Sequence, residues 1–218
     1  MADIIGVIQV KGGVGRSTIA TNLAAIFSAA GPTTLIDCDL PQGTSASWYA
    51  TRQAGTASGD LTLAVARDHG ELVEKAAELN DSQRYIIIDA PPRIAALTRA
   101  IVILSRISLI PLGASAAEIW STADLLQTLD DARKYKADVD ARIVWNRFRA
   151  YTREAQELSE AVHREMKLKE LDARLGFRVA YSEALARGLS VAEWPDKTAQ
   201  EEMGALVDEV KGILKGER

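Results

Sequence analysis

Short, almost uniformly apolar runs alternate along the chain with longer stretches of helical pattern. The runs occupy residues 3–10, 33–37, 61–66, 85–89, 108–112 and 141–146. Their apolar residues are consecutive rather than spaced by two, which is typical of parallel strands covered on both faces. We therefore predict an α/β fold with a mostly parallel sheet and helices on both faces.

Helices are expected over residues 18–30, 71–80, 94–106, 116–136 and 153–168, with a further one over residues 199–215. The last has acidic residues on its polar face, whereas membrane-surface helices are rich in Lys and Arg. We expect it to pack on the core through an apolar stripe: Met203, Leu206, Val207, Val210, Ile213 and Leu214. Because no repeat or linker interrupts the pattern, we predict one domain over residues 1–218.

Composition excludes several classes of protein. Hydrophobic residues make up 47% and charged residues 26% of the chain, as in globular proteins. No apolar run approaches the roughly 18 residues of a membrane span, and the first residues lack the basic region of a signal peptide. The single cysteine, Cys38, cannot form an intrachain disulfide. We expect a cytoplasmic protein with no membrane partner.

The first apolar run is followed by a glycine-rich stretch, KGGVGRST, which leads directly into a helix. Glycines between a strand and a helix let backbone amides approach phosphate groups, and the helix N-terminus attracts their charge. Ser17 supplies the hydroxyl expected on Mg²⁺, and Thr18 can bind the α-phosphate. We predict a nucleotide site formed by Lys11, Gly12, Gly13, Val14, Gly15, Arg16, Ser17 and Thr18.

Three aspartates follow apolar runs. Asp89 ends YIIID, and Asp37 and Asp39 end TTLIDCD. Ligands of open α/β sheets bind at the carboxyl edge of the strands, where these side chains should meet. A carboxylate at that edge can hold Mg²⁺ beside a phosphate, so Asp89 is the expected metal residue together with Ser17.

Together these stretches resemble the ParA/MinD family of deviant Walker A ATPases, most closely its small ParA-type partition and cargo-positioning members. KGGVGRST resembles the family's phosphate loop, LIDCDLPQGTSASWYA its second motif and YIIIDAPPR its Mg²⁺ motif. RVAYSEALARGLSV resembles its late, partly nucleotide-facing segment. The resemblance implies a P-loop NTPase-like fold that binds ATP and Mg²⁺.

The resemblance also implies roles for single residues. Lys11 matches the signature lysine, which reaches across an ATP-sandwich homodimer to the partner's phosphates. Asp39 matches the carboxylate that positions the attacking water, and Asp37 a supporting carboxylate near the metal. Asp89 matches the Mg²⁺ aspartate, and Asn146 lies where the family reads adenine with an amide.

Two positions depart from the family pattern. Leu40 is inserted between Asp39 and Pro41, and Arg16 replaces the lysine that precedes the Ser-Thr pair. Arginine keeps the positive charge but carries it on a longer, planar group. Phosphoryl transfer depends on the placement of charge, so we expect ATP to bind and to be hydrolysed slowly.

Residues 142–187 contain ten basic and seven acidic residues in an otherwise acidic chain. Such a segment can face a polyanion, or it can be a solvated surface whose charges pair locally. The candidate DNA contacts are Arg147, Arg149 and Arg153.

The family resemblance implies non-specific binding to nucleoid DNA and a ParB-like or cargo adaptor that stimulates hydrolysis. The cargo would be a plasmid, a chromosome or a carboxysome-like organelle. Two alternatives remain: a MinD-like membrane-associated positioning ATPase, and a nucleotide-gated binding module with little turnover because of Arg16.

Overall fold

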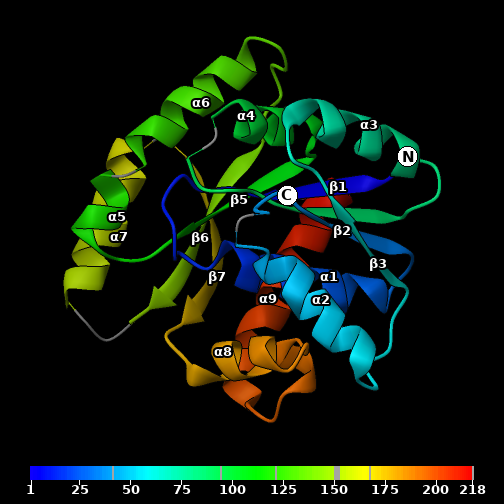
Figure 1. Ribbon diagram of the computed structural model, residues 1–218. Coiled ribbons are helices and arrows are strands. Elements are labelled where there is room, and N and C mark those ends of the chain that lie inside the picture. The colour runs from blue at the N-terminus through cyan, green and yellow to red at the C-terminus, as the bar shows by residue number, and fades with distance from the viewer. Residues whose placement is uncertain (41, 94, 121, 150–152, 167, 218) are drawn as a thin grey trace.

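The computed structural model describes the chain except residues 41, 94, 121, 150–152, 167 and 218, and except the side chains of residues 117, 153–155, 163 and 165. Within this part, the strands form one sheet in the order β3-β2-β4-β1-β5-β6-β7 (Figure 1). Every neighbouring pair is parallel, which confirms the predicted sheet. The strands are β1 (Asp3–Val7), β2 (Thr33–Asp37), β3 (Leu61–Val65), β4 (Tyr85–Asp89), β5 (Ile107–Leu112), β6 (Ala141–Phe148) and β7 (Lys169–Gly176).

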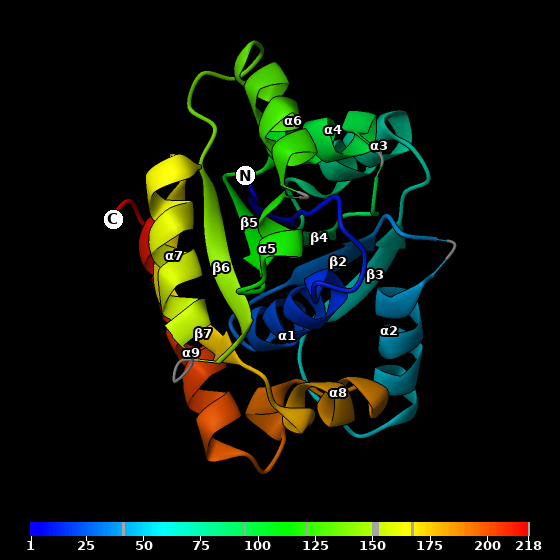
Figure 2. The same cartoon turned by 90° about the vertical axis from the view of Figure 1, so that its left-hand side faces the viewer.

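Helices cover both faces of the sheet, as predicted (Figures 1 and 2). One layer contains α1 (Arg16–Ser28), α2 (Thr44–Ala54), α8 (Val179–Ala186), the short 3-10 helix η1 (Val191–Glu193) and α9 (Lys197–Leu214). The other contains α3 (His69–Leu79), α4 (Ala95–Leu104), α5 (Ala116–Trp120), α6 (Ala123–Arg133) and α7 (Arg153–Glu165). Among the helices of the described residues, none combines the length and the apolar character needed to cross a membrane.

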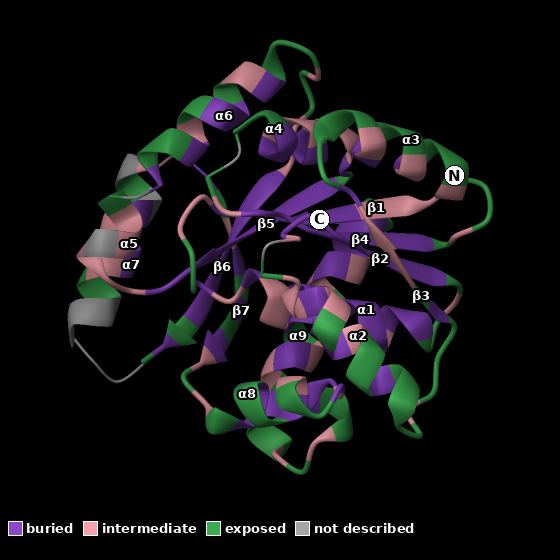
Figure 3. Ribbon diagram, viewed as in Figure 1, coloured by how far each residue is buried: buried purple, intermediate pink, exposed green. Residues whose placement is uncertain are grey.

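The central strands are buried from both sides (Figure 3). In β4, Tyr85 and Ile87 belong to the apolar cluster beneath α1 and α9, whereas Ile86 and Ile88 belong to the cluster beneath α3 and α4. Alternate side chains of one strand therefore enter different cores, which explains why the run is apolar at consecutive positions.

The C-terminal helix packs on the core as its apolar stripe predicts. All six stripe residues of α9 are buried in the cluster shared with α1 and α8. The apolar face of α9 is therefore covered by the protein's own core.

The single helix predicted over residues 116–136 is wrong, because α5 ends at Trp120 and α6 begins at Ala123. The Thr122 hydroxyl donates to the Glu118 carbonyl at 3.0 Å, and the Thr122 N–H to the Ile119 carbonyl at 3.0 Å. A threonine that bonds back to the preceding turn competes with continued helical hydrogen bonding.

Candidate functional site

The strand order brings the predicted motifs to one edge of the sheet. β4 lies between β1 and β2, and Asp89 is in register with Val7 on one side and Asp37 on the other. The glycine-rich loop after β1 and the carboxylates that end β2 and β4 therefore meet at the carboxyl edge. This is where open α/β sheets bind ligands.

The glycine-rich loop needs glycine at its last turn. Gly15 has φ 96° and a Cβ there would collide with the Asn146 amide. Asn146 is buried and donates from Nδ2 to the Val14 carbonyl at 2.7 Å, while its Oδ1 accepts the Arg147 N–H at 2.9 Å. Asn146 thus holds the loop through the end of β6, and its predicted role as an adenine reader stays a prediction.

Arg16 is folded beneath the loop and is only 7% exposed. Its Nε donates to the Ala90 carbonyl at 2.8 Å, and its Nη1 to the carbonyls of Gln9 at 2.7 Å and Lys11 at 2.5 Å. Its Nη2 lies 4.0 Å from the Asp39 carboxylate. Burial lowers the pKa of Arg16, and Asp89 and Asp39 oppose that shift. The guanidinium therefore links the glycine-rich loop by hydrogen bonds to the residues that follow β1 and β4.

Asp89 is buried at the centre of the site, 1% exposed. The hydroxyl of Ser45, a residue that no sequence motif indicated, donates to its Oδ2 at 2.7 Å. Burial raises the pKa of Asp89 to about 7; Asp37 raises it too, while Ser17, Ser45 and Arg16 lower it. A cation that binds beside such a buried carboxylate stabilises its charged form.

Asp37 and Asp39 differ in how their carboxylates are used. Asp37 is fully buried, and its two oxygens accept the backbone N–H groups of Asp39 and Ala46, both at 2.9 Å. The Asp39 carboxylate lies closer to the surface; burial raises its pKa and Arg16 opposes the shift. Asp37 therefore stabilises the connection between β2 and α2, and Asp39 presents its carboxylate to the cavity beside the glycine-rich loop.

The inserted Leu40 is accommodated in a turn directly after Asp39. The Asp39 carbonyl accepts the N–H groups of Gln42 at 3.1 Å and Gly43 at 2.6 Å. Pro41 lies outside the described residues. The turn leaves Asp39 lining the same cavity as the glycine-rich loop.

Two adjoining cavities of about 370 Å³ each share Gly15, Thr18 and Arg147. The first is rich in glycine amides, hydroxyls and charge; it is lined by Gly12, Gly13, Gly15, Arg16, Ser17, Thr18, Asp39, Gln42, Thr44, Pro92 and Arg147. The second is more apolar and aromatic; its lining adds Asn146, Gly176, Phe177, Arg178, Val179, Tyr181, Ser182 and Leu185. A polar cavity joined to an aromatic one matches a phosphate chain joined to a nucleoside.

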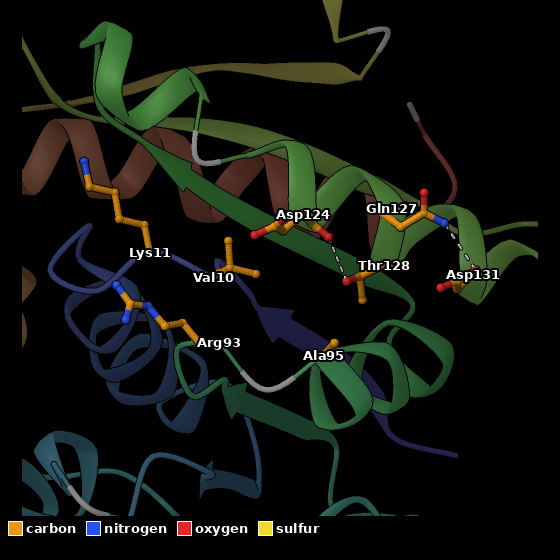
Figure 4. Close-up of a pocket in the computed structure, with 8 residues that line it drawn as sticks. All are labelled: Val10, Lys11, Arg93, Ala95, Asp124, Gln127, Thr128 and Asp131. Atoms are coloured by element: carbon orange, nitrogen blue, oxygen red, sulfur yellow. Dashed lines mark hydrogen bonds between the residues drawn. The ribbon is translucent and has the colours of Figure 1, made fainter.

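Lys11, the predicted signature lysine, is not among the residues that line the glycine-rich cavity. Its Nζ lies 3.9 Å from the carboxylate of Glu118 on α5, and its side chain is 34% exposed. Figure 4 shows Lys11 extending toward α5 at the rim of a third cavity of about 580 Å³, between the loop, the start of α4 and α6. Arg93 lies near Lys11 at the same end of that cavity, and its guanidinium points toward the glycine-rich loop.

That the three arginines contact DNA stays a prediction. Arg147 is exposed where the two cavities adjoin, and Arg149 lies at 5.3 Å over the ring of Phe177, which lines the second cavity. The Arg153 side chain lies outside the described part of the chain. Several other arginines of residues 142–187 are held by local partners: Arg142 by Asp140, Arg174 by Phe148, Arg178 by Glu202 and Arg187 by Trp194.

The residues present fit a Mg²⁺ ion that is held jointly with phosphate. Among the described residues, no three His, Cys, Asp or Glu side chains form a ready metal cluster. Mg²⁺ in phosphate sites takes one or two carboxylates and completes its coordination with phosphate and water. Asp89 has a buried Oδ1 without a hydrogen-bond partner of acceptable geometry, and Ser17 stands beside it.

A parallel sheet with a glycine-rich loop after its central β1, opening a helix beside two acidic strand ends, defines a P-loop nucleotide-binding protein. Comparison with known families agrees with this class. Residues 5–191 match the CobQ/CobB/MinD/ParA nucleotide binding domain, and the chain belongs to that family.

Individual relatives are similar over nearly the whole chain. The "Maintenance of carboxysome distribution protein A" of Halothiobacillus neapolitanus is 25% identical over 96% of both chains. The protein of the same name from Gloeobacter kilaueensis is 30% identical over 91% of this chain and 88% of its own. A Cyanothece McdA variant in complex with ATP has the same fold, with a TM-score of 0.79 and 16% identity over 97% of this chain and 96% of its own.

Proposed function

We propose that this protein is a ParA-type ATPase that binds ATP·Mg²⁺ and positions a cargo. The observation that carries the proposal is the pair of adjoining cavities: one is lined by the glycine-rich loop and Asp39, the other by aromatic and apolar residues of α8 and of the connection that precedes it. ATP would place its phosphates in the first and its nucleoside in the second. The domain proposed for this activity is the whole of residues 1–218.

The roles proposed for the site residues follow their positions. Ser17 and Asp89 would hold Mg²⁺, which neutralises phosphate charge, and Thr18 with the loop amides would bind the phosphates. Asp39 would orient the attacking water from the cavity wall. Asp37 would support that carboxylate indirectly, since both of its own oxygens bind backbone amides.

Lys11 would act in a second copy of the chain. In the single chain it turns away from the phosphate cavity toward Glu118. A lysine at the rim of the site, beside the fixed charge of Arg16, is suited to reach a phosphate across an ATP-bound homodimer. The dimer would bind non-specific nucleoid DNA, and a ParB-like cargo adaptor would stimulate hydrolysis and release it.

The cargo that the relatives favour is a carboxysome. Both relatives described above carry a name that states carboxysome distribution, and each is similar over most of its length. A plasmid or chromosome is the other cargo class that a ParA-type protein could serve. Pull-down of the tagged, ATP-locked protein with candidate cargo adaptors encoded beside its gene would separate these classes.

The test of the central proposal is nucleotide binding followed by light scattering. Fluorescent ATP should bind with Mg²⁺, and the molecular mass should double with a non-hydrolysable ATP analogue but not with ADP. Pelleting with DNA and with anionic liposomes then separates the DNA-associated protein from the MinD-like membrane alternative. The burial of the α9 stripe counts against α9 as the membrane-binding helix of that alternative.

The nucleotide-gated module with little turnover remains the third candidate. It is supported by the position of Arg16, whose hydrogen bonds to three backbone carbonyls use the guanidinium for the loop's own structure. Phosphate release measured at saturating DNA separates this candidate from an active ATPase. A rate no higher than that of the Asp39→Ala variant would favour the binding module.

A further inference from the structure

The two carboxylate oxygens of Asp89 have different surroundings, although the whole side chain is buried. Oδ2 accepts a hydrogen bond from the Ser45 hydroxyl at 2.7 Å. Oδ1 is also buried; the Ser17 hydroxyl stands near the carboxylate and lowers its pKa, but no described residue makes a well-formed hydrogen bond to Oδ1. A buried carboxylate oxygen left in this way is costly unless a ligand completes its surroundings. Oδ1 is therefore the oxygen of Asp89 that remains available to a cation.

Ser45 reaches Asp89 from the first turn of α2, where it is itself fully buried. The next residue, Ala46, donates its backbone N–H to Oδ2 of Asp37 at 2.9 Å. Asp37 and Asp89 end neighbouring strands in direct register. One turn of α2 thus contacts the carboxylates of both strands and fixes how each side chain is rotated.

The other end of α2 is anchored to the C-terminal part of the chain. Arg52 is 4% exposed and binds both oxygens of Glu193 at 2.9 and 3.0 Å. It also donates to the carbonyls of Gly188 at 3.1 Å and Ser58 at 2.8 Å. Gly188 has φ 69°, and a Cβ there would collide with the Arg52 backbone. Such close packing restricts movement of α2 and of the Ser45 hydroxyl that it carries.

We infer that Ser45 is a positioning residue for the Mg²⁺ carboxylate. By occupying Oδ2 it fixes the rotation of the Asp89 side chain and leaves Oδ1 as the oxygen that faces the ion or its bound water. Groups that hydrogen-bond a metal-ligating carboxylate restrict its orientation and raise metal affinity. This inference rests on the proposed ATP·Mg²⁺ site and assigns a specific residue to it.

The experiment is a Mg²⁺ titration of nucleotide binding, which does not depend on turnover. Binding of N-methylanthraniloyl-ATP is followed by fluorescence at increasing Mg²⁺ and also in EDTA. The variants are Ser45→Ala, Ser45→Thr, which keeps the hydroxyl, and Ser47→Ala, which removes an exposed hydroxyl from the same helix. Thermal melting without nucleotide checks that each variant is folded.

Ser45→Ala should raise the Mg²⁺ concentration for half-saturation about ten- to a hundredfold, and should leave the affinity in EDTA unchanged. Ser47→Ala should behave as the parent, and Ser45→Thr should recover most of the Mg²⁺ response. An unchanged half-saturation in folded Ser45→Ala overturns the assignment. Nucleotide binding by Ser45→Ala that is weakened equally with and without Mg²⁺ also overturns it, because that pattern indicates a general structural role for Ser45.

Measurements on the parent protein distinguish a failure of this inference from a failure of the proposed function. A parent that binds no nucleotide overturns the proposed function itself. A parent that binds nucleotide without any Mg²⁺ response overturns the metal role of Asp89 and the positioning role of Ser45 together. If Ser45→Thr does not fold, the comparison of Ser45→Ala with Ser47→Ala still decides the question.

Discussion

Arg16 donates from Nη1 to the backbone carbonyl of Lys11 at 2.5 Å, so the two cations of the glycine-rich loop are tied together. The bond uses the main chain of Lys11 and leaves its side chain to extend toward α5. The Arg16 charge is therefore held beneath the loop, whereas the Lys11 charge lies at the partly exposed rim beside Glu118. We therefore make separate predictions for Arg16 and Lys11.

Arg16→Lys should raise ATP turnover and change ATP affinity only modestly. Lysine keeps the charge but lacks the planar group that binds three backbone carbonyls at once, so its amine is free to move to the phosphates. A misplacement on the order of 1 Å can cost roughly a hundredfold in rate. The measurement is phosphate release at saturating DNA and adaptor, with Asp39→Ala in both backgrounds as the inactive control.

Equal turnover of the parent and Arg16→Lys would show that arginine is a competent substitute and that slow hydrolysis is the wrong expectation. A rise in turnover accompanied by a large loss of ATP affinity would indicate instead that the substitution has destabilised the glycine-rich loop. Arg16→Met, which removes the charge but keeps a long side chain, should weaken ATP binding itself.

Lys11→Ala should give a protein that binds ATP but does not dimerise. The amine lies outside the phosphate cavity of its own chain, so its loss removes a contact that only a second copy would make. Glu118→Gln should act in the opposite direction, because it removes the charge that attracts Lys11 within one chain. Partly exposed pairs contribute about 0.2–1 kcal/mol, so we expect a dimer a few-fold tighter in the presence of ATP.

Light scattering across a concentration series measures both variants. The Gln side chain can still accept the Gly113 N–H that Glu118 accepts at 2.6 Å, which makes it the better-matched substitution. The dimer prediction fails if the mass of the parent is the same with ATP, with ADP and without nucleotide.

DNA binding should depend on Arg149 and Arg153 without loss of nucleotide binding. Arg147 is left out of this test, because it lines both nucleotide cavities and its substitution would affect two functions. Arg149→Glu with Arg153→Glu should reduce the retardation of duplex DNA in ATP and also flatten its salt dependence, because fewer phosphate contacts release fewer counterions. The control is Arg133→Glu with Lys134→Glu on α6, an equal change of charge elsewhere.

A double variant that retards DNA as well as its control does would show that Arg149 and Arg153 are not DNA contacts. That result would favour the interpretation as a solvated surface with local pairing, which the partners of Arg174, Arg178 and Arg187 also fit.

The sequence predicted the central sheet and the loop because their signals are local. The strands that end in Asp37 and Asp89 are buried on both faces, and the glycine-rich loop must lie between a strand and a helix. The edge strand β7 was missed because charged residues alternate with Leu171, Ala173 and Leu175, so it has no uniform apolar run. Helix α2 was missed because its buried residues include Ser45 and Arg52, which are held by hydrogen bonds rather than by apolar contact.

The contacts that complete the site depend on residues distant in sequence. Asn146 meets Val14 across 132 positions, and Ser45 meets Asp89 across 44. No spacing rule connects such pairs, although the hydroxyl-rich stretch TSAS directly after the acidic motif was a signal that could have drawn attention to Ser45. Tyr181 and Ser182 of the segment RVAYSEALARGLSV line the second cavity, and that this segment faces a nucleotide stays a prediction.

Asp89→Asn should stabilise the protein without Mg²⁺ and nucleotide at neutral and alkaline pH. Burial raises the pKa of Asp89 to about 7, above the value of about 3.9 for an unfolded aspartate. The folded state therefore holds the proton more tightly, so the contribution of this group to stability is fully present below about pH 4 and is lost as the pH rises to about 7. Asparagine stays neutral throughout and avoids the loss.

The expected difference grows from about 1 kcal/mol at pH 4.5, where the unfolded carboxyl is already mostly ionised, to at most about 4 kcal/mol at pH 8, because each pKa unit corresponds to about 1.4 kcal/mol. For a chain of this size each kcal/mol shifts the melting temperature by roughly 2–4 °C. Thermal melting of parent and variant from pH 4.5 to pH 8.5 in EDTA measures the difference, and the other acidic groups cancel in the comparison. Added Mg²⁺ and ATP should then stabilise the parent and not Asp89→Asn. A melting difference that stays constant with pH would mean that Asp89 is ionised across the whole range, and that its charge is already compensated by Arg16 and the hydroxyls of Ser17 and Ser45.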